Sequence, residues 1–446
     1  MDALLVMLAT ISPLPSAITH HPSTRIDLEP VWSGHPVGFC LLTEKDQQVA
    51  AYYDANRQMT IAQRRLGETQ WTFTRLPSTV GWDSHNYITM AVDKNDHLHV
   101  AGNMHGAQMT YFRSRDPLNA ATLERIMPMA KAELEQRSTY PRFFMGPDDA
   151  LLFKYRDGKS GEGNDIVNRY DPSAKRWRPL LATPLTDGLG QMNAYFSGPE
   201  PGPDGYFHVC GTWRDTGDCA TNHSLSYARS RDLIRWETAG GKALKLPLSP
   251  KNIDIADPVK SGGGLINISY KLGFDNTKRP VIAYHKYDDG GQSQVFCARF
   301  ESGRWIQRPV TRWQGYRWEF GGGGSIPNVD VGVGEPTPAG DGKIELYWRS
   351  PHESGTFLLD EKTFETLAEA PRKPAEWSNP EGFGKIENPT PGMRLQRRWD
   401  EGKNAPPDSR FVLVWETLGA NRDRPREGPP PPPSMLRVFR LERVKR

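Results

Sequence analysis

Four of the eleven histidines lie in one segment, residues 81–117. In the predicted strand within HLHVAGNMH, His97, His99 and His105 share one face, because alternate residues of a strand point the same way. His97 lies beside a DKND turn and is expected to be exposed, whereas His99 is expected to be either solvated or hydrogen-bonded in the core. His85 and His105 each stand at the end of a predicted strand. A lone histidine is as often structural as functional, but two at matched positions in consecutive strands favour a functional pair.

Tyrosine and arginine side chains beside predicted strands and turns form a second set of candidates. They are Tyr140, Arg156, Tyr195, Arg214 and Arg317. Arg317 precedes four consecutive glycines, residues 321–324. No GxxxxGK[ST] motif accompanies this glycine run and no helix is predicted after it, so it does not indicate a nucleotide-binding loop. We expect it to let the backbone pass close to a bulky group.

Imidazole, phenol and guanidinium groups together suit β-elimination at a uronate that is substituted at its 4-position. The uronate carboxylate must be neutralised so that the C5 proton becomes acidic, and arginine can bind a carboxylate through two hydrogen bonds while it stays charged. A base must then take the C5 proton, and an acid must protonate the leaving oxygen. Histidine can do either near neutral pH, and tyrosine can do so when a nearby cation lowers its pKa. This chemistry requires no cofactor.

Other functions lack their signatures in the sequence. There is no GxSxG nucleophile elbow and no HExxH motif. Acidic residues are common in turns such as DKND, so no carboxylate pair for glycoside hydrolysis stands out. Lysine and arginine exceed aspartate and glutamate by only 3, which argues against a nucleic-acid-binding protein. No apolar run reaches about 18 residues, so no membrane span is expected.

One pattern recurs along the chain: a strand, a polar turn, a second strand, and a second turn closed by tryptophan. It occurs in Val49–Trp71, Ala150–Trp177, Tyr206–Trp236 and Ile266–Trp305. The last three of these tryptophans are separated by 59 and 69 residues. Repeats of about 40 residues or more, each with several short strands, are typical of propeller blades. A chain of 446 residues has room for about seven blades of about 60 residues.

The predicted fold is therefore all-β, a single-domain seven-bladed β-propeller over residues 26–446. A lone four-stranded sheet cannot bury both of its faces, whereas radial stacking buries them and leaves only short edges. Phe411–Leu418 and Met435–Val444 are predicted to form a last hairpin, joined by a loop with five consecutive prolines at 429–433. We expect an extended, exposed loop there, with recognition of a proline-binding partner as the alternative. The best helix candidate is Met129–Arg137, rich in Ala, Glu and Leu.

The cysteines are Cys40, Cys210, Cys219 and Cys297, and they form no CxxC motif. Cys210 and Cys219, with histidines nearby, are compatible with a local disulfide or a metal site, and equally with free thiols packed in strands.

Residues 1–25 are expected to be a signal or leader segment. MDALLVMLATISPLPSA has a short apolar core, but Asp2 takes the place of the usual positive charge and Pro15 interrupts the small-residue pattern before Ala17. A misassigned start codon explains these features equally well. On this basis we expect a secreted or periplasmic protein.

Several segments resemble the BNR-4 β-propeller family: WDSHNYITMAVDKNDHLHVAGNMH, STYPRFF, YRDGKSGEGNDIVNRYD, and WRDT with NHSLSYARSRDLIRW. The resemblance is dense from about Val31 to Trp236 and weaker beyond. The family includes ulvan lyases and lyases that cut rhamnose from glucuronate, and some relatives of the latter are described as α-L-rhamnosidases. VWSGHPVGFCLLT is more similar to the rhamnose–glucuronate group. The resemblance implies a seven-bladed propeller that binds an acidic polysaccharide over its central cavity.

The same resemblance implies roles for individual residues. It places His85 and His105 in the family's histidine pair and Tyr140 and Arg156 at its tyrosine and arginine. Arg156, with Arg214, would bind the uronate carboxylate.

His105 would transfer the proton with Tyr140 as the partner acid or base, and His85 would position the substrate. Tyr195 and Arg317 would contribute to substrate binding. Catalysis would need no cofactor, and some family members hold a structural metal ion, whose ligands this sequence does not identify.

The residues and the resemblance favour a lyase that cleaves rhamnosyl-α-1,4-glucuronate. A glycoside hydrolase (an α-L-rhamnosidase) on the same bond, an ulvan lyase and a non-catalytic sugar-binding propeller are the alternatives. A scaffold for protein partners is a further one, because propellers host many functions. We expect a monomer, with no nucleic-acid partner; the sequence decides neither the polymer nor exo against endo cleavage.

Overall fold

The computed structural model describes residues 25–370 and 376–444. The expected leader, residues 1–25, lies outside the described residues except for Arg25. Within them the chain is all-β, with seven sheets and five short 3-10 helices. None of these helices is long or apolar enough to cross a membrane.

Each sheet is formed mainly by strands consecutive in the chain and paired antiparallel. The first sheet comprises β2 (Cys40–Glu44), β3 (Gln47–Tyr53), β4 (Gln58–Arg65) and β5 (Thr72–Thr79). The second comprises β6 (Ile88–Val92), β7 (Leu98–Gly102), β9 (Tyr111–Ser114) and β10 (Leu123–Arg125). The third comprises β8 (His105–Ala107), β11 (Ser138–Met145), β12 (Leu151–Asp157), β13 (Asn164–Asp171) and β14 (Arg176–Pro179).

The next three sheets continue this order. The fourth comprises β15 (Asn193–Pro201), β16 (Phe207–Arg214), β17 (Asn222–Ser230), β18 (Trp236–Glu237), β19 (Ala243–Leu244) and β20 (Asp254–Asp257). The fifth comprises β21 (Tyr270–Phe274), β22 (Pro280–Tyr287), β23 (Ser293–Glu301) and β24 (Arg304–Pro309). The sixth comprises β25 (Gly332–Val333), β26 (Thr337–Gly340), β27 (Lys343–Arg349), β28 (Ser354–Asp360) and β29 (Thr366–Glu369).

The seventh sheet unites the two ends of the described chain. It comprises β30 (Met393–Trp399), β31 (Ser409–Leu418), β32 (Ser434–Glu442) and β1 (Arg25–Val31). β31 and β32 pair antiparallel, which confirms the predicted C-terminal hairpin, and β1 pairs with β32. The 3-10 helices are η1 (Ser84–Asn86), η2 (Ala120–Thr122), η3 (Ala132–Leu134), η4 (Pro147–Asp149) and η5 (Cys219–Thr221).

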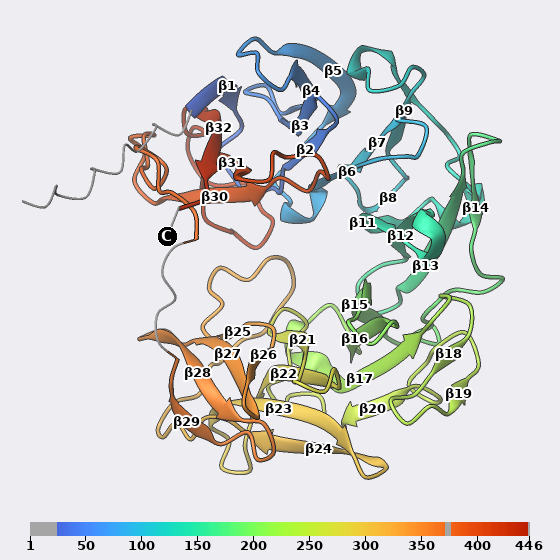
Figure 1. Ribbon diagram of the computed structural model, residues 1–446, viewed down its shortest axis with the longest axis vertical. Coiled ribbons are helices and arrows are strands. Elements are labelled where there is room, and N and C mark those ends of the chain that lie inside the picture. Colours follow the sequence, from blue (N-terminus) through green and yellow to red (C-terminus); the bar gives the residue numbers. More distant parts are fainter. Residues whose placement is uncertain (1–24, 371–375, 445–446) are drawn as a thin grey trace, which may run out of the picture.

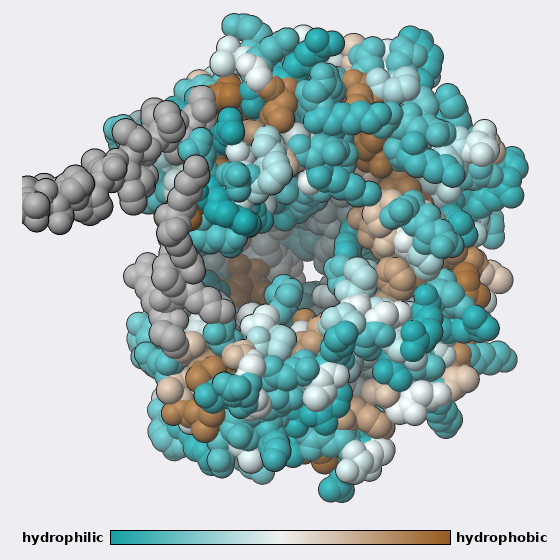
Figure 2. Space-filling view, in the orientation of Figure 1, coloured by the Kyte–Doolittle hydropathy of each residue, from teal (hydrophilic) through white to brown (hydrophobic). Residues whose placement is uncertain are grey.

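The sheets are arranged around a central space, with strands such as β2, β6, β11 and β15 near it and β5, β14, β24 and β29 toward the rim (Figure 1). The middle of the face in view is hollowed (Figure 2). Apolar clusters lie between neighbouring sheets; one joins Phe153 of the third sheet to Tyr111 of the second, and another joins Val295 of the fifth to Leu346 of the sixth. Stacking therefore buries both faces of these sheets, which a single sheet cannot achieve.

The repeating sequence pattern has a direct structural counterpart. Each of its closing tryptophans is buried at or next to the outer strand of its sheet; they are Trp71, Trp177, Trp236 and Trp305. Aspartates order several of the hairpin turns. Asp54, Asp93 and Asp275 each accept two backbone N–H groups, from the residues two and four positions later. Such local acceptors favour tight turns over helices.

Two local predictions from the sequence were wrong. His97 is buried rather than exposed, because its Nδ1 contacts the Ser114 carbonyl at 3.1 Å and its backbone N–H binds Asp93. The segment Met129–Arg137 contains only the short η3. The buried carboxylate of Glu135 accepts the backbone N–H groups of residues 129, 130 and 131, so the chain folds around this side chain instead of forming a longer helix.

The structure also decides between the alternatives that the sequence left open for His99 and for the cysteines. His99 is fully buried, with Nδ1 2.8 Å from the Tyr111 hydroxyl, which selects the core role. All four cysteines are free and buried, so Cys210 and Cys219 form no disulfide.

Candidate active site

The two candidate histidines share one carboxylate. Asp83 caps η1, and its Oδ1 accepts from the backbone N–H of His85 at 2.9 Å and lies 2.6 Å from Nδ1 of the same residue. Its Oδ2 lies 2.5 Å from Nδ1 of His105, the first residue of β8. The two rings stack with centroids 4.0 Å apart. A carboxylate only accepts hydrogen bonds, so each Nδ1 carries the proton that it donates to Asp83. Neither Nε2 has a protein partner among the described residues.

A second carboxylate reaches this pair from the other end of the chain. Asp423 lies in the loop between β31 and β32, and its Oδ2 is 3.4 Å from Nδ1 of His85. Burial acts against it, but hydrogen bonds to Asp423 and Asp83 raise the pKa of His85 to about 9. Burial acts to raise the pKa values of both carboxyl groups, but hydrogen bonds with His105 and His85 hold the pKa of Asp83 well below its usual range, and hydrogen bonds with His35 and His85 do the same for Asp423.

Tyr140 enters the site from an irregular point of β11. The register of β11 against β12 shifts between Thr139 and Arg142, and Tyr140 has φ +58°. A bulge of this kind redirects a side chain out of the ladder. The ring of Tyr140 lies 5.6 Å from that of His85 and 6.1 Å from that of Tyr195. Burial keeps the pKa of the Tyr140 phenol above its ordinary value.

Arg156 in β12 is buried behind the tyrosines. Its guanidinium carbon lies 4.9 Å from the ring centroid of Tyr140 and 6.0 Å from that of Tyr195. Nη2 donates to the Thr139 hydroxyl at 3.1 Å, while Nε and Nη1 have no hydrogen-bond partner in the part of the chain that the structure describes. Among the described residues no carboxylate forms an ion pair with Arg156. By contrast, the buried Arg299 is paired with two acidic side chains.

Tyr195, Arg214 and Ser160 form a connected group beside Arg156. The Ser160 hydroxyl lies 2.9 Å from the Tyr195 hydroxyl and accepts from Nη2 of Arg214 at 2.9 Å. Arg214 also donates to the carbonyls of residues 216 and 217, and it forms no ion pair with a carboxylate in the described part of the chain. Burial opposes the shift, but Arg214 and Arg156 together hold the pKa of Tyr195 below its ordinary value.

These groups surround a cavity of about 510 Å³. His85, Tyr140 and Tyr195 line it directly, and apolar side chains such as Ile268 complete the wall. His105, Arg156 and Arg214 do not line it but contact the residues that do.

Six of the seven residues singled out from the sequence therefore converge. Arg317 does not, since it contacts the Glu319 carboxylate, the Gly291 carbonyl and the ring of Tyr287, none of which belongs to this group.

The acidic side chains that line the cavity are already neutralised. Asp165 lies 3.3 Å from Lys154, and Glu200 lies 2.5 Å from Arg142. Asp83, His85 and His105 are the one group within the described residues whose donor atoms lie close enough together to suggest a metal. Their Nδ1 and carboxylate atoms are bonded to one another, so we interpret the group as a hydrogen-bonded triad. The structural metal ion that the family resemblance allows stays untested, and its ligands are not identified.

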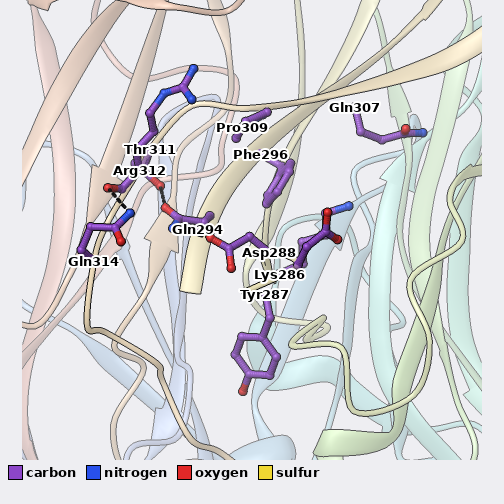
Figure 3. Close-up of a pocket in the computed structure, with 11 residues that line it drawn as sticks. Lys286, Tyr287, Asp288, Gln294, Phe296, Gln307, Pro309, Thr311, Arg312 and Gln314 are labelled. Atoms are coloured by element: carbon purple, nitrogen blue, oxygen red, sulfur yellow. Dashed lines mark hydrogen bonds between the residues drawn. The ribbon is translucent and has the colours of Figure 1, made fainter. Parts of the chain in front are cut away.

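A second pocket, of about 490 Å³, lies beside β22 to β24 (Figure 3). Its buried polar groups are satisfied within the protein: Gln294 accepts from Thr311 at 2.8 Å and donates to Asp288 at 2.9 Å, and Lys286 pairs with Asp257 at 2.6 Å. Its charged side chains without a partner in the described part of the chain, Asp289 and Arg312, are exposed, whereas Arg156 beside the first cavity is buried with two unpartnered nitrogens among the described residues, so the first cavity is the better candidate.

Sequence reasoning missed two residues of the site. Asp83 was detectable, since an acidic side chain two residues before a candidate histidine can orient it. Asp423 lies in the loop predicted to be merely extended, and no local signal connects it to a histidine that precedes it by more than 300 residues.

Comparison with known proteins gives a consistent family and fold. A model of the BNR repeat-containing family matches residues 47–313. No curated protein sequence matches the chain significantly. The polysaccharide lyase Uly1 superposes with a TM-score of 0.59 at 11% identity, covering 95% of this chain and 100% of its own. An ulvan lyase of polysaccharide lyase family 25, bound to -[GlcA(1-4)Rha3S]-, superposes with a TM-score of 0.54 at 13% identity, covering 94% and 96%.

Proposed function

Because the chain belongs to the BNR repeat-containing family and has the fold of two known polysaccharide lyases, one of them an ulvan lyase, we propose that it is a polysaccharide lyase acting by β-elimination at a 4-substituted uronate. We assign rhamnosyl-α-1,4-glucuronate as the linkage. In this proposal the seven sheets are the blades of a propeller, and the protein binds the acidic polysaccharide outside the cell.

One observation carries the proposal: two buried guanidinium groups, Arg156 and Arg214, lie beside the cavity with no carboxylate paired to either among the described residues. Burial of unpaired positive charge is costly. A uronate carboxylate in the cavity would offset that cost and would itself be neutralised, which acidifies the C5 proton. The acidic residues of the cavity wall are already paired with Lys154 and Arg142, so they do not supply the free carboxylate pair of a glycoside hydrolase.

The remaining groups can be assigned by their proton affinities and hydrogen bonds. His105, held through Nδ1 by Asp83, presents a free Nε2 and takes the C5 proton. The phenol of Tyr140, which is kept protonated by burial, donates its proton to the leaving oxygen as the C4–O4 bond breaks. The products are a rhamnose end and a uronate with a C4–C5 double bond. Tyr195 holds Arg214 in place through Ser160 and stacks on its guanidinium.

The test uses the purified protein with gum arabic and with ulvan, followed by ultraviolet absorbance of the unsaturated uronate and by free reducing sugar. A lyase produces the absorbance with the native polymer and neither signal with the carboxyl-reduced polymer. Rhamnose release without absorbance, with solvent oxygen incorporated, would show a hydrolase instead. Binding without either product would show a carbohydrate-binding protein.

Arg156→Gln is expected to reduce turnover about 100-fold or more, by analogy with the loss of one charge-stabilising donor. Arg64→Gln is the matched control. Arg64 is also buried and has no carboxylate partner within the described ranges, but it hydrogen-bonds Gln48 in the first sheet and does not line this cavity. Equal losses in both variants would contradict the assigned role of Arg156.

A further inference from the structure

The carboxylate of Asp423 connects three segments that are distant in the sequence. Oδ1 accepts from the backbone N–H of Ser84 at 3.1 Å and from its hydroxyl at 3.0 Å, and lies 3.2 Å from Nε2 of the buried His35. Oδ2 accepts from the backbone N–H of Ser325, next to the glycine run, at 2.7 Å. The neighbouring Arg422 donates to the carbonyl of Gly321. The loop is thus fixed on both sides and places one charge beside η1.

The two histidines of the site consequently experience different surroundings. His85 has two carboxylates at its Nδ1, from Asp83 at 2.6 Å and Asp423 at 3.4 Å, whereas Asp83 is the one carboxylate that pairs with His105 among the residues described. Because the rings stack at 4.0 Å, placing a positive charge on both costs Coulomb energy. Groups in such contact titrate as a unit, so one proton is favoured over two.

We propose that Asp83 and Asp423 are positioning residues that divide the histidine pair: they hold His85 as a cation and leave His105 as the imidazole that can accept a proton. One part of this proposal rests on the proposed function, namely that the proton accepted by His105 is the C5 proton of the substrate. The charge on His85 is a property of the protein alone.

The other groups that face His85 are consistent with this division. His105 of β8 and Tyr140 of β11 lie against its ring, and neither contributes an opposing charge when neutral. Among the described residues, the groups that form ion pairs with His85 are the two carboxylates, which together bear one more negative charge than the imidazolium, and Tyr195 interacts with it electrostatically. The raised pKa of His85, about 9, has the direction that this arrangement requires.

The role of Asp423 has a functional consequence. A fixed imidazolium in the cavity wall keeps a proton on Nε2 of His85, which has no protein partner among the described residues, and so provides a permanent hydrogen-bond donor for a substrate oxygen. The C-terminal loop thereby becomes part of the site, although it lies between the last two strands of the chain.

The test is a titration of the histidine ring signals by NMR on the full chain without substrate, with His85→Gln to identify the signal of His85. In the wild type, His85 is expected to remain protonated through pH 8 and to titrate near 9. In Asp423→Asn its midpoint should fall by at least one pH unit, and Asp423→Glu should restore it in part. Arg422→Gln is the matched control: it removes the adjacent contact of the same loop with the glycine run and keeps the carboxylate, so the midpoint should not move.

A wild-type His85 that titrates below pH 7 would overturn the proposal, and this measurement does not depend on whether any variant folds. An unchanged midpoint in Asp423→Asn would also overturn it, as would an equal fall in Arg422→Gln. Because no substrate is present, these outcomes differ from failure of the lyase assay, which leaves the titration unaffected. If the lyase assay succeeds, Asp423→Asn should move the alkaline limb of the pH–rate profile to lower pH.

Discussion

The guanidinium carbon of Arg214 lies 4.8 Å from the ring centroid of Tyr195, and the Ser160 hydroxyl hydrogen-bonds both side chains. The positive charge stabilises the phenolate of Tyr195, whereas burial and the adjacent Tyr195 disfavour ionisation of Tyr140. The pKa values of two tyrosines whose rings are 6.1 Å apart are therefore shifted in opposite directions, down for Tyr195 and up for Tyr140.

This difference can be measured by ultraviolet titration of tyrosinate. One tyrosine of the wild-type protein is expected to ionise below its ordinary midpoint of about 10. Tyr195→Phe should remove this early step, and Tyr140→Phe, the matched control, should retain it. Loss of the early step in Tyr140→Phe alone would reverse the assignment of acid and phenolate.

Gly163 provides a packing test of the position of Arg156. A Cβ at residue 163 would lie 2.4 Å from Cδ of Arg156 and 2.1 Å from Oδ1 of Asn193, so Gly163→Ala must displace the arginine or the asparagine. A displacement of about 1 Å can cost about 100-fold in rate, and we expect a loss of that order in the lyase assay. Gly81→Ala is the control, because a Cβ there meets no atom within 4 Å. Full activity in Gly163→Ala would show that the site tolerates movement of Arg156.

The sheet that joins the chain ends contains a buried ion pair whose loss should be costly. Glu416 of β31 accepts from Arg437 of β32 and from the backbone N–H groups of residues 387 and 388, and both charged side chains are almost fully buried. Glu416→Gln leaves Arg437 without this counter-charge and should lower the free energy of unfolding by about 3 kcal/mol.

Glu376→Gln is the matched surface control for this measurement by urea denaturation. Its partner Arg443 lies 3.1 Å away, but both side chains are more than half exposed, so the change should be below about 1 kcal/mol. Similar costs for the two variants would show that the buried pair has no special role in closing the sheet.

The buried imidazole of His285 should make the stability of the folded protein depend on pH. It is fully buried, with Nδ1 2.6 Å from the Gly264 carbonyl and Nε2 2.9 Å from the Ser293 hydroxyl, and burial lowers its pKa to about 4. The unfolded chain binds a proton there below about pH 6.5, while the folded chain does not until about pH 4. Stability is therefore retained above pH 6.5 and falls by about 1.4 kcal/mol per pH unit between these values.

Denaturation between pH 7 and pH 4 checks this expectation. His285→Gln should be less stable at pH 7 and show a shallower fall with pH, whereas replacement of the exposed His352 by Gln should leave the slope unchanged. An identical slope in the wild type and His285→Gln would mean that the ring is protonated in the folded protein.

Much of the architecture was accessible from the sequence because it arises from local rules. Alternating strands, aspartate-ordered turns and a buried tryptophan at the outer strand recur at intervals, and each can be recognised within its own segment. The same locality explains the error at Met129–Arg137: helix propensity was read correctly, but the Glu135 side chain captures the backbone amides that a helix would use.

The residue types of the site and their order along the chain, from His85 to Arg214, were determined by the sequence alone, and so was the chemistry that such groups can perform. Only the tertiary structure decided which of them meet. It left Arg317 outside the site and gave Arg156 and Arg214 no carboxylate partner among the described residues. It also brought Asp423 to His85 through the loop that follows β31. The physical reason is that packing of sheet against sheet fixes where loops from different sheets converge, and a charge acts on whatever that packing places within a few ångströms, irrespective of separation along the chain.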